Sequence, residues 1–478
     1  MRTIVVLICS ALAGCTGGGD GGLGAATMAV GAAAGPAGPV ASTGLVFEPQ
    51  MPALQGELVG MPGTPAPGLG ASYVTTGPGW LGPDGDVIFE GIIRWHSNLE
   101  IGCGIFRQAP DGTVNIVLIQ GQSLAGTGGG HVRHPSLPLH ASGDTLVLTA
   151  LVEGGTVEHG LFAVPKEGGD PVLVLSTPTG VITSAVITES GTVVAEVREP
   201  TGSSIVKVDP GQAPVTLCDA CESGFTTDGR SVLVELGGGA WQIDLDDGSS
   251  VPLVLPGDPA PGQSGTVLSV LDARITPNGD VHVLLQTDDP AHREVLVRID
   301  DAVEVLAACG APAPGLPGSV IESIYPAHGR GDDAVFGASL SGDPVIEAAV
   351  FLAPPAQPAQ PVAVTGEISV ELQALLDVME AETLSGAGGY SVYAATIHKN
   401  GVQAAEGIFR RDPSGAIKLI ATTDARVNMP GEDATVVRFG DPLAPTLDVA
   451  ADGRVLTMVG VRLDRHPTAT YWALYVGR

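Results

Sequence analysis

Basic residues are scarce in this chain. Its 22 lysines and arginines stand against 52 aspartates and glutamates, which gives a formal net charge of −30. So acidic a surface repels phosphate backbones, which excludes nucleic-acid binding, and it repels anionic lipid headgroups as well. The same charge attracts cationic partners or divalent ions, although a simple gain in solubility also explains it.

Aromatic residues and enzyme motifs are also in short supply. Aromatics make up 4% of the chain, which leaves few rings for stacking on sugars. The sequence contains no G-x-S-x-G, no H-E-x-x-H and no phosphate-binding glycine loop with Lys-Ser/Thr. These absences favour a protein without enzymatic activity and without a cofactor.

The N-terminus has the pattern of a secretory signal. Arg2 precedes a short apolar run, Ile4 to Leu12, which is too short for the roughly 20 residues that span a bilayer. The sequence Leu12-Ala13-Gly14-Cys15 that ends this run resembles the lipobox of bacterial lipoproteins. An ordinary signal peptide with a chance cysteine is the alternative.

The resemblance to lipoproteins implies cleavage after Gly14, a diacylglyceryl group on Cys15 and N-acylation. Two or three acyl chains give stable anchoring, where one would be marginal. In lipoproteins of Gram-negative bacteria an Asp after this cysteine retains the protein at the inner membrane, whereas this chain has Thr16. The resemblance therefore favours a cell-envelope location at the outer membrane.

Three segments follow from this reading. Residues 1–14 are the signal peptide, and residues 15–44 combine the lipidated cysteine with a Gly/Ala-rich stretch that we expect to be a flexible tether. Such a coil reaches roughly 30 Å. Residues 45–478 form the folded domain, which we expect to be monomeric.

Glycine and proline are abundant in the folded part. The chain has 68 Gly and 38 Pro, yet 44% of its residues are apolar, so it is not a disordered sequence. Turn residues between short apolar segments predict an all-β protein.

A repeated unit organises residues 45–478. A glycine turn followed by an apolar strand, as in "PNGDVHVLLQT" at Pro277, recurs eight times at spacings of 38 to 64 residues. Two further strands with hairpin signals follow most copies, and a short strand precedes each turn. The eight turn glycines are Gly85, Gly143, Gly191, Gly229, Gly279, Gly331, Gly389 and Gly453. Four strands about every 54 residues predict a single β-propeller with eight four-stranded blades; seven blades, or two β-sandwiches in tandem, are the alternatives.

The ends of the chain predict how the ring closes. The last repeat stops at "YWALYVGR" and lacks a fourth strand, while "GELVGMPGTPAPG" at Gly56 resembles the fourth-strand segments "PLVLPGDPAPG" and "EVLAACGAPAPG". We therefore expect the N-terminal strand to complete the C-terminal blade, and the PAPG segments to connect one blade to the next. Apolar residues at helical spacing predict a short helix within Ile368–Gly386.

The repeats resemble a group of uncharacterised secreted bacterial proteins with tandem N-x-x-G-x-x-A-F repeats and interspersed G-D-P-A-P-G segments. The likeness covers most of residues 56–478 but is degenerate, because the Asn is often replaced and the Ala-Phe rarely survives. It implies repeated β-sheet units outside the cytoplasm and transfers no activity. Eight-bladed lipoprotein propellers that serve in outer-membrane protein assembly offer a looser architectural analogy.

Two segments contain candidate ligand or redox residues. His131, His134 and His140 in "GGGHVRHPSLPLH" can in principle bind a transition metal, but their spacing suits a polar loop better, so we assign no metal site. Cys218 and Cys221 in "CDAC" can form a redox motif, half of a zinc site or a small disulfide, and an oxidising envelope favours the disulfide. We expect Cys103 and Cys309, in blades one and five, to remain unpaired.

The favoured function is a lipid-anchored propeller that binds a protein or glycan partner. An envelope-assembly component is one alternative. A carbohydrate-active lyase or hydrolase with an active site in the channel is the other, and it requires ionisable groups that converge on the inner strands.

Overall fold

The structure is a computed structural model, and it describes most of the chain from residue 57 to residue 477. The described ranges are 57–59, 65–82, 85–97, 100–178, 180–200, 202–222, 224–300, 302–326, 333–343, 346–355, 357–365, 368–369, 374–378, 385–387, 389–399, 402–423, 425–429, 432–439, 447–450, 452–464 and 470–477. They belong to one compact unit. Over these ranges all regular structure is β-strand, and none of it is a helix that could cross a membrane.

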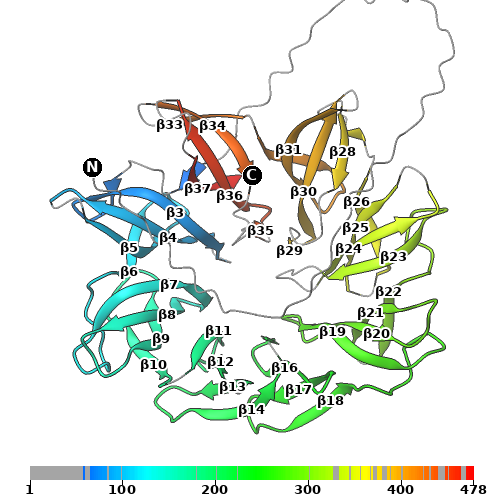
Figure 1. Cartoon of the computed structure of the whole chain (residues 1–478), viewed down its shortest axis with the longest axis horizontal. Helices are drawn as coiled ribbons and strands as arrows, with labels where there is room; N and C mark the ends of the chain where they lie inside the picture. Colours follow the sequence, from blue (N-terminus) through cyan, green and yellow to red (C-terminus); the bar gives the residue numbers. More distant parts are fainter. Residues whose placement is uncertain are drawn as a thin grey trace, which may run out of the picture. The chain divides into compact units, whose positions relative to one another are not determined.

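Eight antiparallel sheets form a ring, so the protein is a β-propeller of eight blades (Figure 1). In the four-stranded blades the strands lie side by side in chain order, and Figure 1 shows the first strand of blades 2 and 3 toward the centre of the ring and the fourth farther out. This arrangement confirms the eight-bladed prediction over seven blades or two sandwiches. The blade-sized repeat predicts a ring of blades because one four-stranded sheet cannot bury both of its faces alone and packs against a neighbour on each side.

Blades 1 to 4 are built from consecutive strands. Blade 1 contains β3 (Ala71–Leu81), β4 (Val87–Trp95), β5 (Ile101–Gln108) and β6 (Val114–Ile119), with the short β2 (Pro65–Ala66) beside β3. Blade 2 contains β7 (His131–Ser142), β8 (Thr145–Glu153), β9 (His159–Pro165) and β10 (Val172–Ser176). Blade 3 contains β11 (Val181–Ile187), β12 (Val193–Glu199), β13 (Gly202–Val208) and β14 (Val215–Cys221). Blade 4 contains β15 (Phe225–Thr227), β16 (Ser231–Leu236), β17 (Gly239–Asp244) and β18 (Ser250–Val254).

Blades 5 to 8 complete the ring. Blade 5 contains β19 (Val267–Ile275), β20 (Val281–Thr287), β21 (Glu294–Ile299) and β22 (Val303–Ala308). Blade 6 contains β23 (Val320–Pro326), β24 (Ala334–Ser341), β25 (Ala348–Ala353) and β26 (Gln360–Val364). Blade 7 contains β27 (Ile368–Ser369), β28 (Ala374–Val378), β29 (Ser385–Ala387), β30 (Tyr390–Lys399), β31 (Val402–Arg411) and β32 (Ile417–Thr422). Blade 8 contains β33 (Arg426–Met429), β34 (Glu432–Phe439), β35 (Leu447–Val449), β36 (Val455–Leu463), β37 (Thr470–Gly477) and β1 (Glu57–Val59).

Blade 8 joins the first and the last strand that the structure describes. The N-terminal β1 pairs antiparallel with the C-terminal β37, with Leu58 opposite Tyr475. This pairing confirms that the first strand completes the last blade. It covers one edge of β37, which would otherwise present unpaired amide and carbonyl groups.

The turn glycines occupy one equivalent place in the blades, between the inner strand and the second strand. The seven that the structure describes have φ angles between 52° and 94°. A side chain in this left-handed region clashes with the backbone, so the turn selects glycine. This constraint explains why a glycine marks the repeat although its neighbours vary.

The hydrophobic core is divided among the contacts between blades. Each of eight clusters of buried side chains combines residues of two neighbouring blades. One of them packs Phe89 and Phe106 of blade 1 against Leu456 and Leu474 of blade 8. The ring is therefore closed both by side-chain packing between blades 8 and 1 and by the pairing of β1 with β37.

The PAPG segments are the crossings between blades. In the first copy, β2 pairs with the start of β3; in the other copies, Pro259 bridges Thr266 and Pro312 bridges Val320. The alanine between the two prolines is buried each time, at Ala66, Ala260 and Ala313. In each of the three PAPG segments, a buried alanine and a β-bridge therefore attach the crossing to the start of the next inner strand.

The helix expected within Ile368–Gly386 is not found in the part of this segment that the structure describes. Over the described residues of this segment the structure has three strands, β27, β28 and β29, and the last two pair with β30. The apolar spacing of the segment also suits a helix, but its position makes it the inner strand of blade 7. There, pairing with β30 satisfies its backbone groups, and tertiary context overrides the local pattern.

Candidate functional site

A cavity between the inner strands of blades 4 and 5 combines several ionisable groups. Its volume is about 300 Å³. The lining residues that carry chemistry are Thr226 of β15, Glu235 of β16, and Asp272 and Arg274 of β19. Leu233, two residues before Glu235 on the same face of β16, adds an apolar lining residue.

Local backbone features place the two carboxylates at this cavity. Glu235 lies near the end of β16, opposite Ala240, next to the tight Gly237-Gly238 turn of the hairpin. The pairing of β19 with β20 shifts register between Val270 and Asp272. Such a bulge bends the strand and changes the direction of a side chain. The hydroxyl of Thr226 accepts a hydrogen bond of 2.8 Å from the Ile275 amide, which ties the two inner strands together.

Glu235 has an unusual electrostatic environment. Its burial, followed by the negative charges of Asp272 and Glu222, raises the pKa of Glu235 to about 7. Glu222 is held nearby, because its amide donates to the Glu235 carbonyl at 3.0 Å and its carboxylate accepts from the Gly238 amide at 2.9 Å. Like charges in a half-buried place disfavour ionisation, so a nearby cation would relieve the repulsion.

Arg274 closes the other side of the cavity. Its side chain is buried and donates through Nη2 to the carbonyl oxygen of Asp333 in blade 6, at 2.9 Å. Burial lowers the pKa of Arg274, and the charges of Asp272 and Asp333 offset part of the effect. Arg274 thus forms one wall of the cavity, and its positive charge offsets part of the negative charge of the carboxylates there.

Behind Arg274 lies a buried histidine between two arginines. Nδ1 of His282 is 3.3 Å from Nη2 of Arg274, and its Nε2 is 3.4 Å from Nε of Arg298. Burial, with these two cations, lowers the pKa of His282 to about 3. Arg298 also donates to the carbonyl oxygens of Ala353 at 2.7 Å and Pro354 at 3.1 Å. This histidine and its two arginines join blade 5 to blade 6 behind the cavity.

The three candidate histidines do not come together. All lie on β7, where His131 and His140 are nine residues apart, roughly 30 Å along an extended strand. His131 and His134 are exposed, while Nδ1 of His140 accepts a hydrogen bond of 3.4 Å from the amide of Ile187 in blade 3. Throughout the described ranges, no three His, Cys, Asp or Glu side chains are grouped so that they could hold a metal ion.

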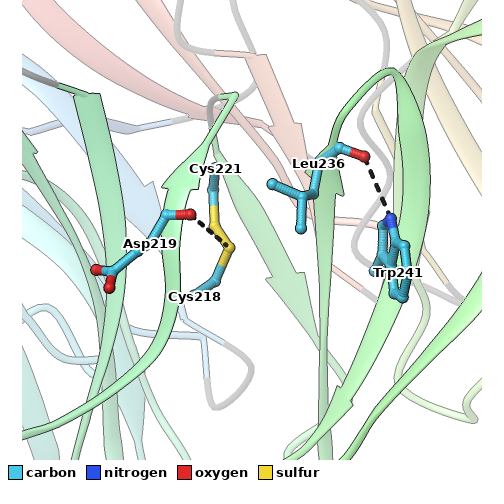
Figure 2. Close-up of a disulfide and its surroundings, with 5 residues drawn as sticks. All are labelled: Cys218, Asp219, Cys221, Leu236 and Trp241. Atoms are coloured by element: carbon cyan, nitrogen blue, oxygen red, sulfur yellow. Dashed lines mark hydrogen bonds between the residues drawn. A yellow bond between two sulfur atoms is a disulfide. The ribbon is translucent and has the colours of Figure 1, made fainter.

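The cysteines of the folded part differ in state. Cys218 and Cys221 at the end of β14 are joined by a disulfide with a Cα–Cα distance of 6.2 Å, and both are buried (Figure 2). Cys103 and Cys309 are free and buried. Burial and the charge of Glu90 raise the pKa of Cys103 to about 12, so its thiol stays protonated at neutral pH and is not an activated nucleophile.

The sequence alone does not single out Glu235, and the inner-strand segment "LDARITP", which contains Asp272 and Arg274, has too few ionisable residues to predict a site. Two signals for them exist. "LDARI" places two charged residues on a mostly apolar inner strand, and "VLVEL" places a glutamate just before the last residue of an apolar strand. Their convergence depends on the contact between two blades, which no single repeat displays. Cys15 and the rest of the N-terminal segment lie outside the described residues.

One protein-family profile and several solved structures match this chain. The profile of DUF7453, a family of unknown function, matches residues 176–429, which include blades 3 to 7. A search of curated proteins found no match.

Several solved structures are similar to this chain at 9 to 14% sequence identity. The propeller domain of the Trilobed protease from Pyrococcus furiosus has a TM-score of 0.40 at 9% identity, with 73% of this chain and 96% of that one covered. The tricorn protease has 0.39 at 10% identity, and this chain spans only 44% of its length while 84% of this chain is covered. TolB from Acinetobacter baumannii has 0.29 at 14% identity, with 70% and 79% covered. Because these scores lie below 0.5, the fold assignment depends on the strand pairing described above.

Proposed function

The chain belongs to DUF7453, a family of unknown function, and we propose that it is a lipid-anchored binding module of the bacterial cell envelope. In this proposal the acyl groups on Cys15 hold the protein at the outer membrane, and the tether lets the propeller reorient. The propeller binds a protein partner through the cavity between blades 4 and 5, which accepts a lysine or arginine side chain.

One observation carries this proposal. Glu235 has a pKa of about 7 because it is partly buried beside two other acidic residues at a preformed cavity. An incoming ammonium or guanidinium group is attracted to the carboxylates and favours the ionised form of Glu235. Leu233, which lines the cavity on the same strand face as Glu235, offers an apolar contact to the methylene stem of such a side chain.

The net charge of the chain supports the same partner class. At −30, the surface attracts basic proteins over a distance and increases their association rate. The cavity then supplies a specific place for one basic side chain. The anchoring at Cys15 supplies the location, because the negative surface itself gives no attraction to anionic lipids.

Calorimetry with capped tripeptides tests the cavity. We expect acetyl-Gly-Lys-Gly-amide to bind, and its glutamine counterpart not to bind. The change Glu235→Gln should weaken binding about tenfold, because a charge-assisted contact is lost. Affinity for the lysine peptide should rise with pH through about 7, as Glu235 becomes ionised.

The exposed Glu189 provides a matched control. Glu189→Gln removes the same charge from the molecule but lies in a turn of blade 3, so it should leave the affinity unchanged. Equal binding of the lysine and glutamine peptides, or equal effects of the two variants, would refute the cavity as the binding site.

A hydrolase or lyase is the second candidate, and the same carboxyl pair favours it. Glu235 is partly protonated at neutral pH, and Asp272 lies beside it, an arrangement that general acid–base catalysis on sugars uses. Release of reducing or unsaturated sugar ends from a polysaccharide, lost in Glu235→Gln and kept in Glu189→Gln, would replace the binding-module proposal with this one.

A further inference from the structure

We infer that the Cys218–Cys221 disulfide controls the cavity between blades 4 and 5, so that reduction of this bond loosens the wall that carries Glu235. The inference rests on the proposed function for its ligand, but its structural part is measured without any ligand. Both cysteines belong to the segment through which the chain leaves blade 3 for blade 4.

The residue that follows the second cysteine is anchored to the wall of the cavity. Glu222 comes directly after Cys221 and contacts the β16–β17 hairpin twice. Its amide donates to the Glu235 carbonyl at 3.0 Å, and its carboxylate accepts from the Gly238 amide at 2.9 Å. Any displacement at Cys221 therefore reaches the backbone of Glu235 through one residue.

The sulfur atoms also pack against the same wall. Cys218 and Cys221 belong to a buried cluster with Val234 of β16, against which Phe225 and Trp241 pack. Figure 2 shows the disulfide opposite Leu236 and Trp241 of the hairpin. Glu235 follows Val234 on β16 and therefore faces the opposite side of the strand, so the sheet of blade 4 lies between the disulfide and the cavity.

The backbone between the cysteines is under conformational strain. Ala220 has φ of 57°, the left-handed region, and it is the one described residue other than glycine with a positive φ. Such a conformation persists only where the surroundings impose it. The disulfide that closes over Ala220 supplies this constraint, and the register of β14 against β13 shifts within the same stretch. Once the bond is reduced, Ala220 can return to an extended conformation.

The position of the disulfide allows it to be reached. β14 is the outermost strand of blade 3 and pairs on one side only. Asp219 and Ala220 are exposed, although the sulfur atoms themselves are buried. Opening of this edge presents one sulfur to a dithiol reductant. The reductant breaks the S–S bond, gives two electrons and two protons to form two cysteine thiols, and becomes a disulfide itself.

The experiment compares oxidised protein with protein reduced by dithiothreitol. Hydrogen exchange of peptides covering residues 222–240 should become about tenfold faster after reduction, because the anchored hairpin opens more often. Affinity for acetyl-Gly-Lys-Gly-amide should fall about threefold. Cys103 and Cys309 are already free, so among the described cysteines the reductant changes only this pair.

Two variants make the result specific. The double variant Cys218→Ser, Cys221→Ser should behave as reduced protein and no longer respond to dithiothreitol. Ala220→Gly accepts the left-handed conformation without strain, so its exchange rates should change less than threefold on reduction.

Unchanged exchange of residues 222–240 on reduction would overturn the inference. An equal response of wild type and Ala220→Gly would overturn the part assigned to backbone strain. If exchange responds but no lysine peptide binds either form, the coupling stands and the proposed ligand is wrong.

Discussion

At the scale of single residues, the environment of Glu235 makes stability depend on pH. Its pKa is about 7 in the folded protein, against an ordinary value of 4.5 that we take for the unfolded chain. Between these values the unfolded chain has lost the proton while the folded protein retains it. Stability therefore falls as pH rises from about 4.5 to 7, and it falls no further above this range.

Glu235→Gln should remove this loss of folding stability above pH 4.5, because glutamine does not ionise. We expect its melting temperature to exceed that of the wild type by roughly 1–3 °C at pH 8, with a smaller difference at pH 5.5. Thermal unfolding at the two pH values measures it. Glu189→Gln, which replaces an exposed glutamate, should show no such pH-dependent gain. A constant difference between wild type and Glu235→Gln across this range would contradict the raised pKa.

At the scale of the element, β1 is a strand of three residues with a large topological effect. It supplies the outer strand of the last blade, and without it β37 becomes an exposed edge. Removal of residues 45–60 should therefore lower the melting temperature by several degrees and promote aggregation. Removal of residues 45–55 retains Glu57–Val59 and serves as the matched control.

Differential scanning calorimetry measures the melting temperature of the two deletion variants, and light scattering measures their aggregation. If the longer deletion melts at the same temperature as the shorter one, the pairing of β1 with β37 contributes nothing to ring closure. The buried side chains shared by blades 8 and 1 would then hold the ring together by themselves.

The strands and turns differ in how well the sequence predicts them. A glycine that must adopt positive φ is visible in any alignment of the repeats, so turns such as Gly279 and Gly453 were predictable. The segment Ile368–Gly386 was not, because its apolar spacing fits a helix and a strand alike. Pairing with β30 decides between them, and a local pattern does not contain that partner.

At the scale of the whole molecule, the proposed acyl anchor on Cys15 would decide where the propeller works. Cys15→Ser should abolish lipidation and release the protein from the membrane fraction, because the acidic surface offers no other attachment. Fractionation of cells and the mobility of the processed chain measure this. A variant that stays membrane-bound and is processed as before would refute the lipoprotein assignment.

The sequence by itself determined the architecture of this protein. Eight glycine turns, alternating strands and an N-terminal segment that matches the missing fourth strand predict an eight-bladed propeller closed by its own first strand, because each feature is a local constraint on one repeat. The tertiary structure alone decided the site. Glu235 belongs to blade 4 and Asp272 and Arg274 belong to blade 5, and the disulfide that packs against the other face of the blade-4 sheet ends blade 3. Only the packing of three blades around the ring brings these groups together and raises the pKa of one carboxyl to about 7.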